Sequence, residues 1–307
     1  MKEIAIKINR SQSTISREIS RNTGGRGYRY KQAHRLTRER HQEKNKSVKL
    51  TPELKEILNK YIKKDYSPEQ ISGRLKLKVQ ISIHHETIYQ YILADKRDGG
   101  ELYKHLRHQN KTYRKRYGSA HNRNGIKDRV DIDERPEAAN KRERVGDWEL
   151  DTIIGKNHKG AIVTMDDRKT KLRLAYPLPG KKAQDVKDAM IKLLRPIKSW
   201  VHTTTYDNGK EFSLHKAVSQ ALDCDAYFAK PYHSWERGQN ENANGLLRQY
   251  FPKFMELIDI PVADVFEAVD KLNSRPRKCL GYRTPYEVFE SHTGINIKKL
   301  KSYALMT

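Results

Sequence analysis

The chain has 307 residues, of which 36% are hydrophobic and 33% charged, and its formal net charge at pH 7 is +24. That length allows two or three compact domains, each with a modest core. Such a charge excess attracts polyanions, because binding phosphates releases their counterions, so nucleic acid is the first candidate partner. No apolar run approaches the roughly 20 residues that cross a membrane, and the first residues lack a signal-peptide apolar stretch.

Basic residues are concentrated in the first half of the chain. Residues 1–146 hold 36 basic and 18 acidic side chains, whereas residues 147–307 hold 26 and 20. A membrane-surface protein is the competing interpretation of this charge, but it needs long amphipathic helices that are not obvious here. The two cysteines, Cys224 and Cys279, suit a reducing compartment. We therefore expect a cytoplasmic, nucleoid-associated protein of bacterial type, with no membrane partner.

The N-terminal residues 3–22, "EIAIKINRSQSTISREISRN", predict two short helices around a polar turn. Ile4 and Ile8 are one helical turn apart, and so are Ile15 and Ile19. The pattern is typical of a helix-turn-helix, whose second helix enters the major groove of DNA. An ordinary amphipathic hairpin is the alternative. The residues expected to contact bases or phosphates are Gln12, Ser13, Thr14, Arg17 and Arg21.

Residues 47–103 predict a second helical DNA-binding unit. Ser67, followed by Pro68 and by Gln70, matches the capping box at the start of a helix, and Ser82 is expected to cap a third helix. On that third helix the residues expected to face DNA are His84, His85 and Thr87. The two histidines are not expected to bind metal, because adjacent residues on a helix point in different directions.

From residue 145 the pattern changes to an α/β domain. Strands are expected at 148–155, 160–167 and 171–178, followed by a helix at 181–197, a strand at 200–209, a helix at 211–222, a strand at 224–229 and a last helix that holds Glu241. Three consecutive strands followed by alternating helices and strands indicate a mixed sheet. The expected domains are 1–46 (helix-turn-helix plus a basic helix), 47–103 (second helical unit), 104–144 (basic linker), 145–292 (α/β core) and 293–307 (tail).

Two aspartates are placed where such a domain carries chemistry. Asp151 lies within the first strand and, by the period of two, shares a face with Ile153. Asp207 ends a later strand, at the edge where α/β sheets usually bind ligands. The following Asn208 and Gly209 are also ordinary turn residues, so a structural turn is the alternative.

Glu241 is the third acidic residue of interest. On a helix with 100° per residue, it points away from the apolar stripe of its own segment. The residues within about 60° of it on that helix are Asn244, Gly245 and Arg248. Glu236 lies beyond Gly238, a helix breaker, so the helix does not fix its direction. Glu241 is therefore the better candidate.

Carboxylates from two strands and one helix are the ligands that a pair of magnesium ions needs, with Mn²⁺ as a substitute. Mg²⁺ takes hard oxygen ligands and shares its shell with substrate phosphates. Two ions about 4 Å apart activate the attacking oxygen and stabilise the leaving one. We therefore predict that Asp151, Asp207 and Glu241 are catalytic metal ligands, while the surrounding Lys and Arg hold the DNA backbone.

Several sequence motifs occur in a recognisable order, with 33 residues between Asp207 and Glu241. They read "SPEQISGRL", "HHETIYQYI", "IKDRVDIDERP", "GDWELDTIIGK", "DNGKEF", "YFAKPYHSWERGQNENANGLLRQYFPK" and "LNSRPRKCLGYRTPYEVF". Together these motifs cover nearly the whole chain. They resemble the DDE transposases of the insertion-sequence-30 family, which have a ribonuclease H-like (integrase-like) catalytic core.

The resemblance implies a reaction and a set of supporting residues. A metal-bound water hydrolyses a strand at each element end, and the exposed 3′-OH attacks another phosphodiester. Two ends must be joined, which implies a homo-oligomer. Arg248 resembles the basic residue that contacts DNA beside the site, and Asn208 and Asn244 are expected to orient ligands or phosphates. Family members usually begin with a further helix before "EIAIKIN", so the first unit is expected to be truncated.

Two other functions fit parts of the pattern. A sequence-specific DNA-binding regulator with an inactive integrase-like core would bind DNA without turnover. A ribonuclease H-type nuclease would use similar metals, but it would not need two sequence-reading units before its core. Trp148 and Trp235 are expected in the scaffold, and His233 either at DNA or in a structural hydrogen bond.

Overall fold

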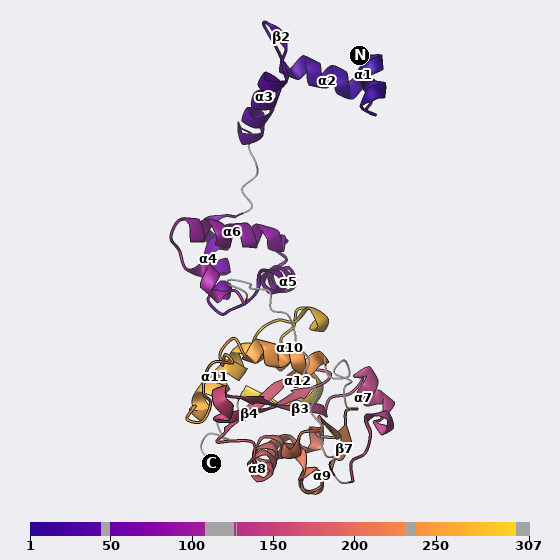
Figure 1. Cartoon of the computed structure of the whole chain (residues 1–307), viewed down its shortest axis with the longest axis vertical. Helices are drawn as coiled ribbons and strands as arrows, with labels where there is room; N and C mark the ends of the chain where they lie inside the picture. The colour runs from indigo at the N-terminus through magenta and orange to yellow at the C-terminus, as the bar shows by residue number, and fades with distance from the viewer. Residues whose placement is uncertain (44–49, 108–125, 127, 231–237, 299–307) are drawn as a thin grey trace. The chain divides into compact units, whose positions relative to one another are not determined.

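The computed structural model describes residues 1–43, 50–107, 126, 128–230 and 238–298. Glu236, His233, Trp235 and, within the expected basic linker, residues 108–125 and 127 lie outside these ranges. The chain divides into two compact units, residues 1–52 and 53–307 (Figure 1), and each is considered by itself below. None of the helices in the described ranges has the length and apolar character that crossing a bilayer requires.

The N-terminal unit consists of three helices and a minimal two-stranded ribbon. Its elements are α1 (Lys2–Lys7), α2 (Gln12–Asn22), β1 (Thr23–Gly24), β2 (Gly27–Tyr28) and α3 (Tyr30–Glu43). The Ser11 side chain caps α2 by accepting a hydrogen bond from the backbone N–H of Thr14. Of the four isoleucines that set the expected period, only Ile15 is buried, and α1 buries Ala5 instead.

The larger unit begins with three helices, α4 (Pro52–Ile62), α5 (Pro68–Val79) and α6 (His85–Arg97), and the short η1 (Leu102–His105). The expected capping box is confirmed, since Ser67 and Gln70 exchange hydrogen bonds at the start of α5. The expected cap at Ser82 is wrong: α6 begins two residues later, where the His84 ring accepts a hydrogen bond from the Glu86 N–H. Ser82 and His84 are both polar residues that precede an apolar helix, so the local sequence does not indicate which of them caps it.

A five-stranded mixed sheet forms the centre of the larger unit, as expected. Its strands are β3 (Asp147–Ile154), β4 (Ala161–Asp167), β5 (Arg173–Leu178), β6 (Thr203–Tyr206) and β7 (Asp225–Phe228), in the order β5-β4-β3-β6-β7. β4 is antiparallel to both β3 and β5, whereas β3, β6 and β7 run parallel. The strongly apolar character of β3 and β4 allowed these central strands to be predicted from the sequence.

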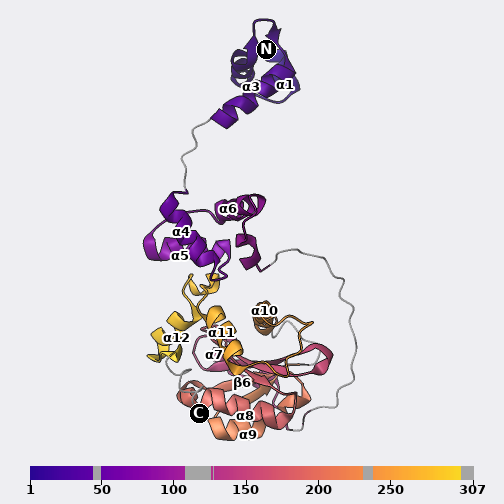
Figure 2. The same cartoon turned by 90° about the vertical axis from the view of Figure 1, so that its left-hand side faces the viewer.

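Helices cover both faces of this sheet (Figure 2). On one face Trp148 and Leu150 pack with α8 (Ala183–Leu194), α9 (His215–Leu222) and α12 (Pro285–Thr293). On the other face Ile153 packs with α10 (Gly238–Leu247) and α11 (Val262–Asn273). Asp151 alternates with Leu150 and therefore lies on the α10 face with Ile153, as the period of two predicts. The remaining short helices are η2 (Ile132–Glu134), α7 (Glu137–Lys141), η3 (Lys156–His158), η4 (Arg195–Trp200), η5 (Lys210–Phe212) and η7 (Lys278–Leu280).

The end of the segment expected to be a basic linker is part of the core. Residues 131–141 form η2 and α7, where Ile132 and Ala139 are buried. Arg135 is also buried, and its guanidinium donates hydrogen bonds to Asn140 and Thr205. These apolar and paired residues order a stretch whose composition alone suggested a solvated linker.

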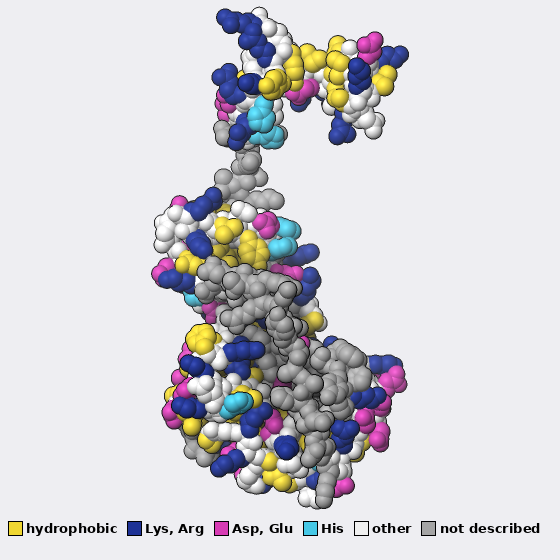
Figure 3. All heavy atoms as spheres, viewed as in Figure 1, with side chains coloured by type: hydrophobic (Ala, Val, Ile, Leu, Met, Phe, Trp, Pro, Cys, Tyr) yellow, Lys and Arg dark blue, Asp and Glu magenta, His cyan; other side chains and the backbone are white. Residues whose placement is uncertain are grey.

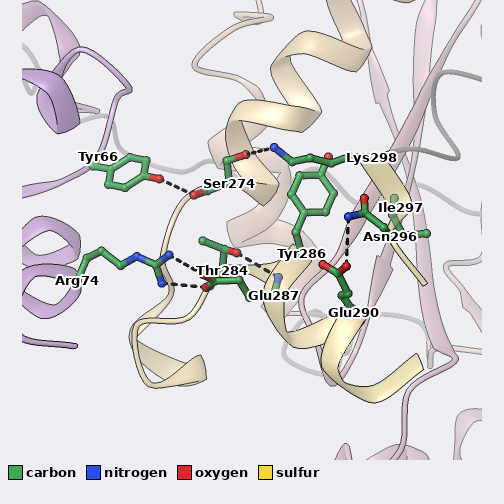
Figure 4. A pocket seen from close by; sticks show the side chains of 10 residues that line it. All are labelled: Tyr66, Arg74, Ser274, Thr284, Tyr286, Glu287, Glu290, Asn296, Ile297 and Lys298. Atoms are coloured by element: carbon green, nitrogen blue, oxygen red, sulfur yellow. Dashed lines mark hydrogen bonds and ion pairs between the residues drawn. The ribbon is translucent and has the colours of Figure 1, made fainter. Parts of the chain in front are cut away.

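The first helices of the larger unit contact its C-terminal helices (Figure 4). Arg74 of α5 makes two hydrogen bonds, of 2.8 and 2.6 Å, to the carboxylate of Glu287 on α12. The Tyr66 hydroxyl donates to the Ser274 carbonyl at 2.6 Å. A pocket of about 280 Å³ lies between these two contacts. The helical part is therefore attached to the sheet domain by specific polar contacts.

Candidate active site

Asp151 and Asp207 lie on neighbouring parallel strands. The register of β3 and β6 pairs Glu149 with Thr205. Asp151 comes two residues after Glu149 in β3, and Asp207 comes two residues after Thr205, directly beyond the end of β6. Neighbouring strands are about 4.8 Å apart, so the two aspartates belong to one edge of the sheet. Both are half-buried.

The carboxylate of Asp151 is held from both sides. Its Oδ2 accepts a hydrogen bond of 2.8 Å from the Asn244 side-chain amide, and its Oδ1 accepts one of 2.8 Å from the Thr152 N–H. Asn244 belongs to α10, which packs on β3 and β4. The predicted supporting role of Asn244 thus corresponds to a direct contact with the first aspartate.

Asp207 also takes part in a turn. Its Oδ1 accepts a hydrogen bond of 2.8 Å from the Gly209 N–H. Asn208 fixes the same turn, because its amide donates to the Ala229 carbonyl at 2.7 Å and its Oδ1 accepts from Arg129 at 2.6 Å. The turn considered as an alternative is therefore present, and it holds Asp207 in place at the end of β6.

Glu241 lies in the first turn of α10 and is exposed. Asn244, which binds Asp151, follows it by three residues on the same side of the helix, so Glu241 stands one turn away from that contact. Arg248, expected to contact DNA, donates a hydrogen bond of 2.8 Å to the Ile154 carbonyl at the end of β3. Burial lowers the pKa of Arg248. In this structure Arg248 attaches α10 to the sheet.

The oxygen donors of the site suit a hard divalent cation. Their separation in this structure restricts the metal binding that they can support without moving. Asp151 and Asp207 offer carboxylates at one sheet edge, the ligand type that Mg²⁺ and Mn²⁺ prefer. Among the described residues, no three side chains of Asp, Glu, His and Cys stand close enough to hold a metal ion. The structure thus places Asp151 on β3 and Asp207 directly after the neighbouring strand β6, with Glu241 one helical turn from the contact between Asn244 and Asp151.

A further carboxylate that the sequence did not single out lies beside Asp207. Glu211 is buried, and its Oε1 accepts hydrogen bonds from Thr152 at 2.9 Å and from Lys181 at 2.7 Å. Burial raises the pKa of Glu211, but the bonds from Lys181 and Thr152 outweigh it and lower the pKa overall. Its position in "DNGKEF", four residues after Asp207, is the sequence signal by which it could have been found.

The residues expected to face DNA are accessible in both helical regions. On α2, all five predicted contact residues are exposed: Gln12, Ser13, Thr14, Arg17 and Arg21. On the larger unit His84 is exposed and His85 and Thr87 are half-buried. The centroids of the two histidine rings are 4.2 Å apart, with the ring planes tilted by 33°. Lys and Arg side chains spread over the visible face of the N-terminal unit, whereas on the larger unit they alternate with acidic ones (Figure 3).

Known proteins include several that are similar to this chain. The transposase for insertion sequence element IS4351 of Bacteroides fragilis is 48% identical over 291 residues, which are 94% of this chain and 89% of that protein. Transposase InsI for insertion sequence element IS30A of Escherichia coli (strain K12) is 32% identical over 302 residues, 94% of this chain and 78% of that protein. Among solved structures, the catalytic core domain of BIV integrase aligns with a TM-score of 0.37 and 23% identity, over 51% of this chain and 97% of that one. No family model matches the chain.

Both transposases are more than 30% identical to this chain, which covers more than two thirds of the length of each. The chain therefore belongs to the insertion-sequence-30 family of transposases. The resemblance stated from the sequence motifs is confirmed. The protein is an enzyme of DNA transposition. Its larger unit is built on the mixed sheet with helices on both faces.

Proposed function

We propose that this transposase cleaves and joins DNA strands with divalent metal ions held by Asp151, Asp207 and Glu241. The supporting observation is the hydrogen bond to Asp151 from Asn244, one helical turn after Glu241, together with the parallel pairing of β3, which holds Asp151, with β6, which Asp207 directly follows. A bound pair of Mg²⁺ or Mn²⁺ ions would supply the activation of the attacking oxygen and the stabilisation of the leaving oxygen.

Residues of the chain itself supply the orientation that this chemistry needs. Asn244 fixes the direction of the Asp151 carboxylate, and the Gly209 N–H fixes that of Asp207. Asn208 holds the turn after β6 through Ala229. Arg129, which binds Asn208, brings a positive charge beside the carboxylates where a phosphodiester would lie.

DNA binding is proposed for two helical regions. In the N-terminal unit, α1 and α2 would act as a helix-turn-helix, with α2 in the major groove and Arg17 and Arg21 at bases or phosphates. In the larger unit the first turn of α6 presents His84, His85 and Thr87. The two relatives are named transposases, so the proposed DNA partners are the ends of an element and a target, joined within a homo-oligomer.

The proposal is tested on a supercoiled plasmid that carries the gene and its flanking DNA. The full chain is incubated with it in Mg²⁺, in Mn²⁺ and in EDTA, and nicked and joined products are separated and sequenced. The expected result is cleavage at defined element ends in either metal and none in EDTA. Tight binding of the same DNA without cleavage in any metal would contradict the proposal and favour a DNA-binding regulator.

A further inference from the structure

A buried ion pair lies behind the candidate active site, on the β4–β5 hairpin. Arg173 and Asp166 are 3% and 2% exposed, and the guanidinium binds both carboxylate oxygens, at 2.8 and 2.5 Å. Replacing a buried pair of this kind by apolar residues is often neutral or stabilising, so stability alone does not explain it. The remaining N–H groups of Arg173 show which other element of the fold it binds.

Those donors reach α10, the helix that carries Glu241. The Arg173 Nη1 donates a hydrogen bond of 2.7 Å to the Ala243 carbonyl, and its Nη2 donates one of 2.9 Å to the Asn244 Oδ1. The Thr164 hydroxyl lies 3.2 Å from the same Oδ1. Two donors therefore converge on one side-chain oxygen of α10.

This convergence decides which way the Asn244 amide points. An amide has one accepting end and one donating end, and a guanidinium only donates. With Oδ1 bound to Arg173 and Thr164, the Nδ2 of Asn244 faces Asp151 and donates to it at 2.8 Å. The flipped amide would set its oxygen against the Asp151 carboxylate and leave Arg173 facing an N–H, which is unfavourable at both ends.

The same hairpin also holds the start of α10. Lys171 donates a hydrogen bond of 2.6 Å to the Gln239 side chain, and Gln239 donates to the Asp167 carbonyl at 3.2 Å. On the other side, Asn273 of α11 bonds the backbone of Arg173 through both its side-chain oxygen and its nitrogen. The hydrogen bonds of Arg173 thus connect the sheet to α10 and α11, the two helices on this face.

We propose that Arg173 is a positioning residue for catalysis: through Asn244 it orients the Asp151 carboxylate for metal, and through Ala243 it sets the position of the helix turn that carries Glu241. The inference rests on the proposed function, because it presumes that Asp151 and Glu241 hold metal. Arg173 itself touches neither substrate nor metal.

The test is a double-mutant cycle between Arg173→Lys and Asn244→Ala in the full chain. Arg173→Lys keeps the positive charge opposite Asp166 but loses the planar fork that reaches Asn244. The readouts are Mn²⁺ binding to the protein without DNA, followed by electron paramagnetic resonance, and the Mg²⁺ concentration that gives half-maximal plasmid nicking. Loss of a charge-assisted hydrogen bond predicts that Arg173→Lys needs about tenfold more metal in both measurements. In the Asn244→Ala background the same substitution is expected to have little further effect.

Two more variants keep the result interpretable. Thr164→Val removes the other donor to Asn244 without disturbing the ion pair, and it is expected to raise the metal requirement in the same direction by a smaller factor. Arg74→Lys is the matched control, since it changes another bidentate Arg–carboxylate pair in the same unit and is expected to leave metal binding unchanged. If Arg173→Lys does not fold, Thr164→Val is measured in its place.

The outcomes separate this inference from the proposed function. An unchanged metal requirement in Arg173→Lys, or the same loss with and without Asn244, would overturn the positioning role while wild-type cleavage stands. If the wild-type protein neither binds Mn²⁺ nor nicks the plasmid in metal, the proposed function itself fails. A fall in thermal stability without a change in metal requirement would assign Arg173 a purely structural role.

Discussion

The side-chain amide of Asn244 donates a hydrogen bond of 2.8 Å to the carboxylate of Asp151, across 93 positions of sequence. One residue belongs to α10 and the other to β3, so this single contact links the helix of Glu241 to the strand of the first aspartate. The proposed active site therefore depends on the packing of α10 against the sheet as much as on the three carboxylates of the site.

Asn244→Ala is expected to reduce metal-dependent nicking about tenfold, the usual cost of losing a hydrogen bond to a charged group. The midpoint of thermal unfolding should change little, because Asn244 is half-buried and its loss leaves no large cavity. The initial nicking rate at saturating DNA measures the effect. Asn242→Ala, an exposed position on the same helix, serves as the control and should stay within about twofold of wild type. Equal rates for the two variants would refute the role of Asn244.

Gly73→Ala is expected to detach the first helices of the larger unit from its C-terminal region. A Cβ on Gly73 would lie 2.2 Å from a ring carbon of Tyr282, so the ring must move or the helices must separate. Limited proteolysis should then cut within 53–107 faster than in wild type. Gly180→Ala is the control, because its Cβ would meet nothing within 4 Å. Equal cleavage rates in the two variants would show that the contact at Gly73 is unimportant.

Glu287 is expected to make stability depend on acid pH. The hydrogen bonds from Arg74 lower the pKa of Glu287 from an ordinary 4.5 to about 2. A lowered folded-state pKa stabilises the fold above the unfolded value, and this contribution is lost as the pH falls from about 4.5 through 2.

Arg74→Ala should therefore be less stable than wild type at pH 6, and the difference should shrink between pH 4.5 and 2, as followed by urea unfolding. Lys271→Ala, at an exposed ion pair on α11, is the control and should run parallel to wild type. A pH-independent difference between Arg74→Ala and wild type would contradict the assignment.

Arg17→Ala and Arg21→Ala are expected to weaken DNA binding, if α2 lies in the major groove. Each phosphate contact releases about one counterion, so each variant that loses one should lower the slope of log affinity against log salt by about one. Fluorescence anisotropy with labelled element ends at several salt concentrations measures this slope. Lys271→Ala should leave it unchanged, and unchanged slopes in both arginine variants would remove α2 from the interface.

The elements that carry the site could be predicted because their signals are local. Short runs of apolar and β-branched residues marked β3 and β4, and the helical wheel placed Glu241 and Asn244 on one side of α10. These inferences use residues within a few positions of one another.

The interactions that support the site could not be predicted in the same way. Arg173 and Asp166 form a buried ion pair between strands, and in sequence they look like ordinary charged residues of a basic protein. Arg74 meets Glu287 across 213 positions, which no local pattern encodes. Arg248, expected at DNA, also donates a hydrogen bond to the Ile154 carbonyl at the end of β3, a contact that no local pattern indicates.

The most direct test of the account compares wild type with Asp207→Asn in the same Mg²⁺ buffer, for both cleavage and binding of element-end DNA. Asparagine keeps the size of the side chain and its turn with Gly209, but it removes the charge that would hold metal. The account predicts that plasmid cleavage is abolished while DNA affinity stays within about twofold, since the proposed DNA contacts lie elsewhere. Cleavage by Asp207→Asn at the wild-type rate would contradict the metal assignment and with it the proposed mechanism.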